Sequence, residues 1–510
     1  MKLRLALGVV ALMAINHAAT YGNAFKPIVK TSERTISLDS GYLPAQNSNR
    51  GMAGFNTEVL MGLGAAYDAG YSYFQPENSV TRALYYGGFW LASFPIAAST
   101  VVTFHEFGHG SRMYSFGEKP VYVHALGECN NYFSEWGALA FNGYFVLPMV
   151  GRFGAAARPD LDLDTIEKHY DHLKNYVDLD KAKKYTHYAE KCKELNKKIK
   201  DDKKLFEHYK ESQKLLKDQQ KDYLKKRFSD DEIETFDFFS EDDIGKNNPL
   251  SPEATGIIVA GGLNNNVYMA QRIEDAIWFG QGQHMQLTTN YFKDKASTFI
   301  QVFEGSFIAY LQGENPSEGI SDHNRVVKVW DEHLDIHVSR TELQLYSILS
   351  YFLSAQTYMN LYQVYQTWTQ GETQVYPAEW KGFRLPNVSL YLTTKGPTYN
   401  VRTGYRWDND LFLIAGAEFV LSGKQQVEGT LGLRKVFPDL GNMYVHAEAV
   451  FNQKAVGGTV SIGGTFNKLI TAEVGVSYHD NDTFYGERHI PFLWKGSTDI
   501  EAWAKIGVQY

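Results

Sequence analysis

Apolar and polar side chains alternate at every second position in the last quarter of the chain, from about residue 385 to residue 510. About eight segments of roughly 8 to 12 residues keep this period, and clusters such as Asp408-Asn409-Asp410 separate them. In the final segment Ile500 and Ile506 lie on one face, with Glu501 and Lys505 on the other. The pattern predicts antiparallel strands joined by hairpin turns.

The two faces of these predicted strands differ strongly in charge. One face carries almost no Lys, Asp or Glu, whereas the other carries Arg402, Glu418, Glu428, Arg434 and Glu448. A soluble sandwich shows the same local alternation. The uncharged face nevertheless favours an outer-membrane β-barrel of about eight strands over residues 385–510. Its own side chains would fill the interior, so we expect an anchor and not a wide pore.

The chain begins with the pattern of a secretory signal. A basic start, Met1-Lys2-Leu3-Arg4, precedes an apolar run from Leu5 to Ile15, and Gly22-Asn23-Ala24 supplies small residues for cleavage. The run is too short to span a bilayer comfortably. We therefore expect residues 1–24 to be a cleaved signal peptide, the chain to reach the outer membrane, and the domain that precedes its strands to face the periplasm.

The middle of the chain divides into two kinds of sequence. Residues 25–158 and 249–375 are apolar and compatible with helices, whereas residues 159–248 are rich in Lys, Asp, Glu and Tyr. We expect the first two ranges to form one mainly helical domain and the third a charged helical insert. The predicted fold is thus multidomain α+β, with a mainly helical domain followed by an antiparallel barrel.

One apolar stretch in the helical part is long enough to cross a membrane. Ala83 to Phe104 contains no ionised side chain. Gly87, Gly88 and Pro95 dilute its hydrophobicity, so we interpret residues 83–116 as a buried core helix, which Ser93 and Pro95 could open.

The overall charge and the cysteine count exclude two classes of function. The chain has 50 basic and 58 acidic residues and a net charge of −8, which argues against a nucleic-acid partner. Cys129 and Cys192 form at most one disulfide and cannot build a tetrahedral sulfur site.

The candidate chemistry lies at His105-Glu106-Phe107-Gly108-His109. Residues four apart project from the same face of a helix, so two imidazoles can share one zinc ion. Glu106 then lies close enough to move a proton between a water and a leaving amine. This arrangement is typical of metallopeptidases.

With Gly117 eight residues after its second His, this motif resembles the HExGH-x7-G pattern of site-2-type intramembrane zinc proteases. The resemblance covers about 35 residues, including the apolar approach from Gly87 to Phe104. More broadly it is similar to the zincins. It implies that His105 and His109 are zinc ligands and that Glu106 is the general base. The Pro-containing segment ending in Asp-Gly that supplies the third ligand in site-2-type proteases is not found here.

A third ligand is required, because two imidazoles hold zinc weakly. The run Gly261-Gly262-Leu263-Asn264-Asn265-Asn266 predicts a turn before a helix over Val267 to Phe279, and that helix carries Glu274 and Asp275. As candidates for the third metal ligand, we rank Glu274 first and Asp275 second. Glu128, which follows His109 with 18 residues between, comes third.

These features together predict a zinc-dependent endopeptidase of the bacterial cell envelope, with outer-membrane lipid and a protein or peptide substrate as its partners. Two alternatives stay open. One is a non-catalytic outer-membrane structural or adhesion protein in which the two histidines are merely packed. The other is an inner-membrane protease of the site-2-like, intramembrane type.

Overall fold

The computed structural model describes most of the chain beyond the predicted signal sequence. The described residues are 35–39, 48–124, 127–128, 153–212, 215, 217–239, 247–280, 284–312, 322–408, 410–440, 442–466, 469–480, 482–488 and 500–509. The predicted signal peptide and Cys129 lie outside them.

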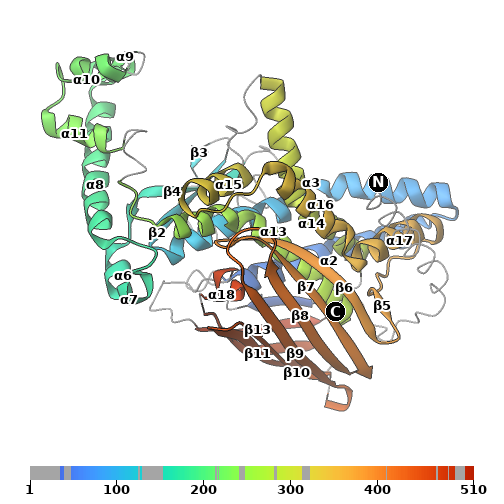
Figure 1. The fold of residues 1–510 in the computed structure, drawn as a ribbon. Coiled ribbons are helices and arrows are strands. Elements are labelled where there is room, and N and C mark those ends of the chain that lie inside the picture. The colour runs from blue at the N-terminus through green and yellow to red at the C-terminus, as the bar shows by residue number, and fades with distance from the viewer. Residues whose placement is uncertain are drawn as a thin grey trace.

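Helices form a layer that covers one side of a large sheet (Figure 1). Buried side chains from α2, α3, α13 and α14 form one core cluster, and a second cluster joins α13 and α15 to the sheet. The helices of this layer are α2 (Asn49–Phe74), α3 (Ser79–Ser115), α13 (Pro252–Trp278), α14 (Met285–Gln312), α15 (Asp322–His333), α16 (Arg340–Phe352) and α17 (Ala355–Gln370).

The large sheet has ten strands in the order β1-β13-β12-β11-β10-β9-β8-β7-β6-β5, and all its neighbours are antiparallel. Mixed α+β architecture with a helical N-terminal part is thereby confirmed. The strands are β1 (Thr35–Asp39), β5 (Glu379–Trp380), β6 (Phe383–Thr393), β7 (Gly396–Asp408), β8 (Leu411–Val420), β9 (Val427–Phe437), β10 (Met443–Phe451), β11 (Val456–Phe466), β12 (Ile470–Tyr478) and β13 (Ile500–Gln509).

The sheet is open, so the prediction of a closed barrel is wrong for the described residues. Edge strands β1 and β5 do not pair with each other there. The physical reason is that helix α13 occupies the inner side of the sheet. Trp278 packs against Phe412 of β8 with ring centroids 5.4 Å apart, and Arg384 of β6 donates to Asp275 at 2.7 Å. An eight-stranded barrel has room only for its own side chains, whereas this sheet curves around a helix.

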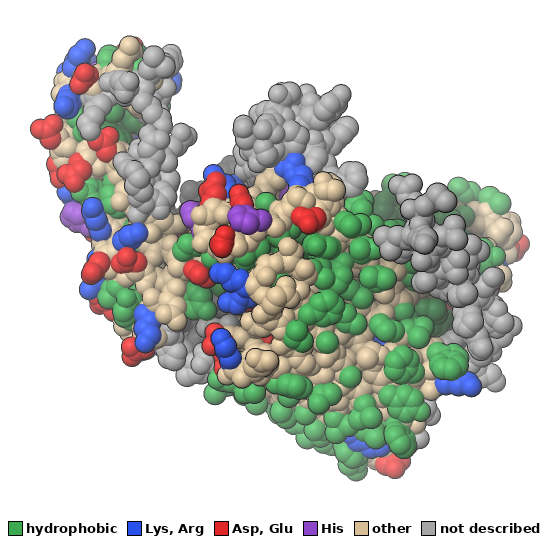
Figure 2. All heavy atoms as spheres, viewed as in Figure 1, with side chains coloured by type: hydrophobic (Ala, Val, Ile, Leu, Met, Phe, Trp, Pro, Cys, Tyr) green, Lys and Arg blue, Asp and Glu red, His purple; other side chains and the backbone are tan. Residues whose placement is uncertain are grey.

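The polarity of the sheet is the reverse of that in a soluble protein. Glu418, Glu428 and Arg434 are buried on the face toward the helices. On the opposite face Val427 is 65% exposed and Val460 52% exposed. Hydrophobic side chains cover most of the visible outer surface of the sheet in Figure 2. Exposed apolar area on this scale marks an interaction surface.

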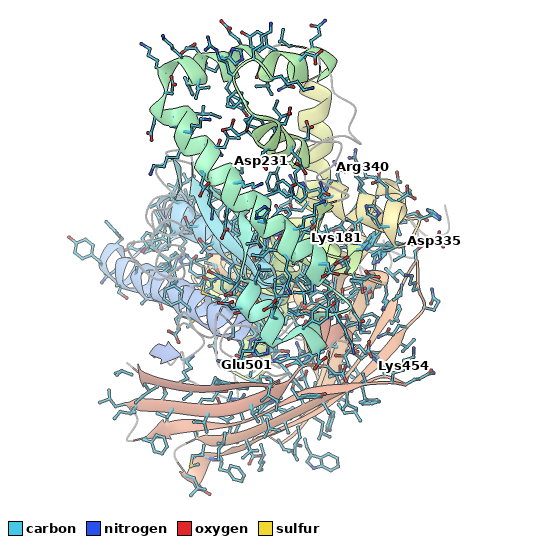
Figure 3. All side chains as sticks on the ribbon, turned by 90° about the vertical axis from the view of Figure 1, so that its left-hand side faces the viewer. Lys181, Asp231, Asp335, Arg340, Lys454 and Glu501 are labelled. Carbon is cyan, nitrogen blue, oxygen red and sulfur yellow. The ribbon has the colours of Figure 1, made fainter. Side chains whose placement is uncertain are left out.

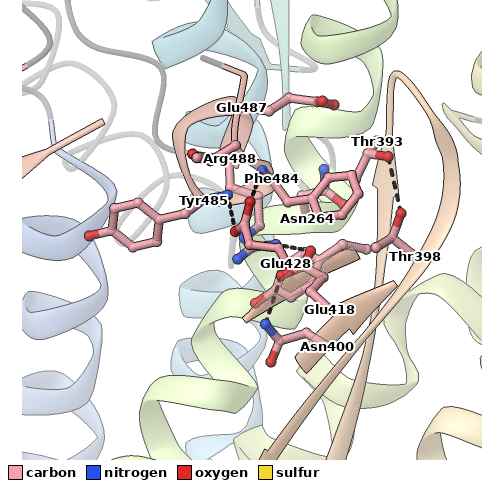
Figure 4. A network of polar contacts seen from close by, with 12 residues as sticks. Asn264, Thr393, Thr398, Asn400, Glu418, Glu428, Phe484, Tyr485, Glu487 and Arg488 are labelled. Atoms are coloured by element: carbon pink, nitrogen blue, oxygen red, sulfur yellow. Dashed lines mark hydrogen bonds and ion pairs between the residues drawn. The ribbon is translucent and has the colours of Figure 1, made fainter. Parts of the chain in front are cut away.

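A short helix, α18 (Phe484–Arg488), closes the polar inner face near the helical layer. Glu428 accepts hydrogen bonds from the backbone N–H groups of Phe484 and Tyr485, at 2.9 and 3.3 Å (Figure 4). Arg488 donates to Glu418, and its backbone oxygen accepts from Arg112 of α3. The carboxylates of β8 and β9 therefore hold a helix that also contacts α3.

Helix α3 begins earlier than the sequence predicted. The side chain of Asn78 caps it by accepting from the N–H groups of Val80 and Thr81, and Pro95 lies inside the helix. Only its second half is buried: Leu84 in the first half is 70% exposed. The interpretation of residues 83–116 as a buried core helix is thus wrong for the first half. Among the described residues, α3 is the single helix long and apolar enough to cross a membrane.

The charged stretch forms an arm of helices that extends from the helical layer (Figure 1). Figure 3 shows Lys181 near the base of α8 and Asp231, on α11, farther from the sheet. Leu195, Ile199 and Ile233 belong to a small separate core between α8 and α11. The arm contains α6 (Leu163–Lys168), α7 (Tyr170–Leu173), α8 (Leu179–Asp201), α9 (Lys203–Ser212), α10 (Lys217–Leu224) and α11 (Asp230–Phe238), and a small sheet at its base contains β2 (Glu118–His124), β3 (Gly127–Glu128) and β4 (Phe153–Leu161).

Replacing Trp278 by Ala is expected to lower the free energy of unfolding by roughly 3–5 kcal/mol, because a large buried ring is lost between α13 and the sheet. Urea unfolding in detergent, followed by circular dichroism, measures this change. Trp407→Ala is the matched control, since Trp407 is 66% exposed on β7 and its loss should change stability by less than about 0.5 kcal/mol. Equal losses in both variants would contradict the packing role.

Candidate metal centre

The second half of α3 places His105 and His109 one turn apart on the same buried face. Their Nε2 atoms lie 3.3 Å from each other, and their ring centroids are 5.0 Å apart. This half of α3 is buried because it packs against α13. The structure therefore brings together the two imidazoles that the sequence predicted as ligands.

A carboxylate from another helix completes a group of three possible ligands. Asp322 is the first residue of α15, and its Oδ2 lies 2.8 Å from Nε2 of His105 and 3.2 Å from Nε2 of His109. The three ligand atoms all lie within 4.8 Å of one another. Two imidazoles and one carboxylate are a donor set that catalytic zinc sites use, with the fourth position left for water or substrate.

The hydrogen bond at Nδ1 of His109 supports a role of this residue as a metal ligand. Its Nδ1 lies 2.8 Å from the backbone oxygen of Ile258 on α13. Since a carbonyl oxygen only accepts, Nδ1 carries a proton, and Nε2 is the nitrogen left for a metal. Burial opposes a charge on this ring, but Asp322 outweighs it and raises the pKa of His109 to about 9. Without a metal Nε2 is therefore protonated and donates to Asp322, and a bound ion would replace that proton. Metal-binding histidines are commonly oriented by such a bond.

Asn266 provides the corresponding contact for His105. Its Nδ2 lies 3.3 Å from Nδ1 of His105, and its Oδ1 is buried without a hydrogen-bond partner among the described residues. Turning the amide by 180° puts Oδ1 next to Nδ1, where it accepts the ring proton and leaves Nε2 of His105 free to bind a cation. The residues around the imidazoles therefore fit a bound metal.

The glycine-rich run lies inside helix α13 and forms no turn, contrary to the sequence prediction. A Cβ on Gly262 would lie 2.5 Å from Nε2 of both His105 and His109. A Cβ on Gly261 would lie 2.5 Å from the backbone oxygen of Gly108. The glycines are needed for the close approach of two helices, and the asparagines that follow are held by buried hydrogen bonds.

Electrostatics tie the three candidate ligands together. Burial alone would raise the pKa of Asp322, but the two imidazoles outweigh it and hold that pKa below its usual range. The carboxylate of Glu106, half-buried on the same helix, is close enough to act on His109 electrostatically. Glu106, next to His105 in the sequence, is thus the candidate for a general base.

Glu274, the predicted third ligand, lies elsewhere. It is buried in contact with Nζ of Lys295 at 3.1 Å and with the hydroxyl of Tyr291 at 3.0 Å, and both partners belong to α14. Eight residues along a helix leave Glu274 rotated by about 80° from Asn266, away from α3. The prediction is corrected: Asp322 occupies that place.

Asp275, the second-ranked candidate, is also outside the ligand group. Asp275 pairs with Arg384 and Arg402 of the sheet. Glu128 lies on β3, where its backbone pairs with Val123, and its side chain is outside the described part. Sequence reasoning missed Asp322, whose one signal is an acidic residue in the first turn of a helix.

No family model, curated protein or solved structure matches this chain.

Asp322→Ala should weaken metal binding by roughly tenfold or more, because only two imidazoles remain to hold the ion. His105→Ala should do the same, whereas Glu274→Gln should keep about one metal per chain. Metal analysis of the purified proteins after dialysis, with zinc titration, measures these differences. Loss of metal in Glu274→Gln together with retention in Asp322→Ala would reject the assignment of the third ligand.

Proposed function

We propose that this chain is a zinc-dependent endopeptidase of the bacterial cell envelope, held in the outer membrane by its sheet. The observation that carries the activity is the convergence of His105, His109 and Asp322 beside Glu106. A purely structural protein has no need for two buried imidazoles whose Nε2 atoms face each other and one carboxylate. The non-catalytic alternative is therefore less well supported.

His105, His109 and Asp322 would hold the metal, and the backbone of Ile258 with the amide of Asn266 would fix the two rings. Zinc, when bound, lowers the pKa of a water and polarises the scissile carbonyl. Glu106 accepts a proton from the attacking water as its oxygen adds to the carbonyl carbon. Glu106 then donates that proton to the amine nitrogen as the carbon–nitrogen bond breaks.

Glu106→Gln is expected to reduce peptide hydrolysis by a factor of about 10² to 10⁴, because the amide cannot take up the proton. Metal content should stay the same, since Glu106 is not among the three ligands. Cleavage of unfolded envelope proteins by the purified chain with zinc measures the effect. Glu332→Gln, an exposed change on α15, is the control.

Full activity in Glu106→Gln would reject the enzyme and favour the structural or adhesion protein. A loss of activity that is equal in Glu332→Gln would also contradict the role of Glu106. Retained metal in both variants separates lost chemistry from a damaged site.

The membrane location is supported by the outward apolar face of the sheet. Strands β6 to β13 have 9 to 13 residues, a length suited to crossing the outer-membrane hydrocarbon layer at a tilt. Their apolar face points outward and their charged face points toward α13, as in membrane barrels. Helix α13 would then fill the space that a closed barrel leaves to its own side chains.

The exposed first half of α3 favours a second candidate, the inner-membrane, site-2-like protease. Tyr86 of α3 lies with its ring centroid 6.0 Å from that of Trp368 on α17, and both helices carry further exposed apolar side chains. A helical apolar surface of this kind suits an inner membrane. Membrane fractionation of the native chain distinguishes the two locations.

Val460→Arg should destabilise the chain in lipid vesicles by about 2–4 kcal/mol, because it places a charge in the hydrocarbon layer at the middle of β11. The same change on a water-exposed sheet alters stability by less than about 0.5 kcal/mol. Urea unfolding in vesicles measures the difference, and Gln453→Arg in the exposed β10–β11 turn is the control. No difference between the two variants would contradict contact of this face with lipid.

A further inference from the structure

A second polar site lies between helix α13 and the inner face of the sheet. A cavity of about 160 Å³ is lined there by side chains from α2, α13 and α18, from strand β7 and from strands β9 to β13. It is separate from the candidate metal centre, because the helix α13 residues that line it begin at Tyr268, beyond Asn266. Its lining includes six cationic side chains and four carboxylates: Arg50, Arg272, Arg402, Arg434, Arg488, Lys505, Asp275, Glu448, Glu473 and Glu501.

The carboxylates of the cavity are already engaged by other side chains. Asp275 pairs with Arg384 and Arg402, and Glu448 pairs with Arg402 at 2.9 Å. Arg50 and His479 pair with Glu501. Tyr444 donates a hydrogen bond to Glu473, which Lys505 faces across the β12–β13 pair. Further partners outside the lining engage two more of the cations, since Arg488 pairs with Glu418 and Lys505 with Glu58. Two guanidinium groups remain without a carboxylate partner of their own, and Tyr444 makes a hydrogen bond with one of them, Arg434.

Arg272 is the first of these two groups. Tyr268, Arg272, Ala276 and Phe279 follow one another at helical spacing, so one face of α13 lines the cavity. Within the part of the chain that the structure describes, Arg272 makes no hydrogen bond and no ion pair with another residue. Its side chain is exposed in the cavity although most of α13 is buried.

Arg434 is the second group, and His446 lies beside it. The two residues are direct partners across β9 and β10. The guanidinium of Arg434 is held over the ring of Tyr444, 3.8 Å from its centroid, and near Phe279, at 4.8 Å. Nε of Arg434 and Nδ1 of His446 are buried without a hydrogen-bond partner among the described residues.

These observations describe a site suited to an anion. Two guanidinium groups that face one cavity repel each other, and a buried polar atom without a partner costs free energy. Guanidinium groups hold phosphate and carboxylate oxygens in paired hydrogen bonds, which are among the strongest in proteins. The imidazole of His446 adds one further donor in its neutral form.

We propose that this cavity binds a small oxyanion, the phosphate or carboxylate group of a water-soluble molecule, between Arg272 and Arg434 with His446 as an additional donor. The polar lining argues for a soluble ligand and against a lipid, whose tails would have to pass a wall of charged side chains. The site does not depend on the presence of a metal at His105 and His109.

The test measures binding of inorganic phosphate and of succinate to the full-length chain in a neutral, phospholipid-free detergent. Calorimetry gives the affinity, and the melting temperature gives the stabilisation, with sodium chloride of equal ionic strength as the reference. We expect saturable binding near one anion per chain. Arg272→Gln and Arg434→Gln should each weaken it at least tenfold, whereas Lys454→Gln, in an exposed turn, should leave it unchanged.

A second measurement separates binding from folding. Burial and the charge of Arg272 lower the pKa of Arg434, so Arg434→Gln should melt at the same temperature as the parent chain, or higher, when no anion is present. A lower melting temperature of Arg434→Gln would show that this arginine serves the fold, and the proposal would fail.

Three other outcomes would also overturn it. One is the absence of saturable binding of either anion, and another is an equal loss of binding in Lys454→Gln. The third is stabilisation that depends on Arg272 but needs vesicles containing phosphatidylglycerol, which would identify a lipid headgroup in place of a soluble ligand.

Discussion

The close contact between helices α3 and α13 is the constraint on which the candidate metal centre depends. Gly108 faces Gly261, and Gly262 lies directly against the two imidazole rings, so the helices approach as closely as their backbones allow. This approach lets Ile258 and Asn266 reach the rings from α13. Any side chain at Gly262 would have to displace His105 and His109. Two helices far apart in sequence are thus required to build one site.

The same helix α13 links this centre to the sheet. Its first half contacts α3, and its last turns insert Asp275 and Trp278 among side chains of β6, β7 and β8. The inner face of the sheet is charged because it surrounds a polar cavity, and its outer face is apolar. Both halves of the chain therefore contact one central helix.

Local patterns were sufficient to predict the elements that depend on local order. The alternation over residues 385–510 predicted the strands, and the spacing of His105 and His109 predicted two rings on one helix face. Asp322 could not be found in this way, because more than 200 residues separate it from the motif and only tertiary packing brings α15 to α3.

The open sheet could not be predicted for a similar reason: alternation defines two faces but does not show that a helix will cover one of them. The run of glycines and asparagines has the composition of a turn, and it is helical because its small residues and amide groups are used in contacts with α3 and β6.

The outward apolar surface of the sheet also bears on how the chain matures. In the proposed membrane location this surface would face lipid, and its strands would complete their pairing only as they enter the bilayer. Helix α13 contacts both the sheet and the two imidazole rings. A chain whose sheet is incomplete would therefore lack the contacts that hold α13 against both rings. Under the proposed function the chain would then be its own zymogen, because the proposed hydrolytic group would be assembled only in the membrane.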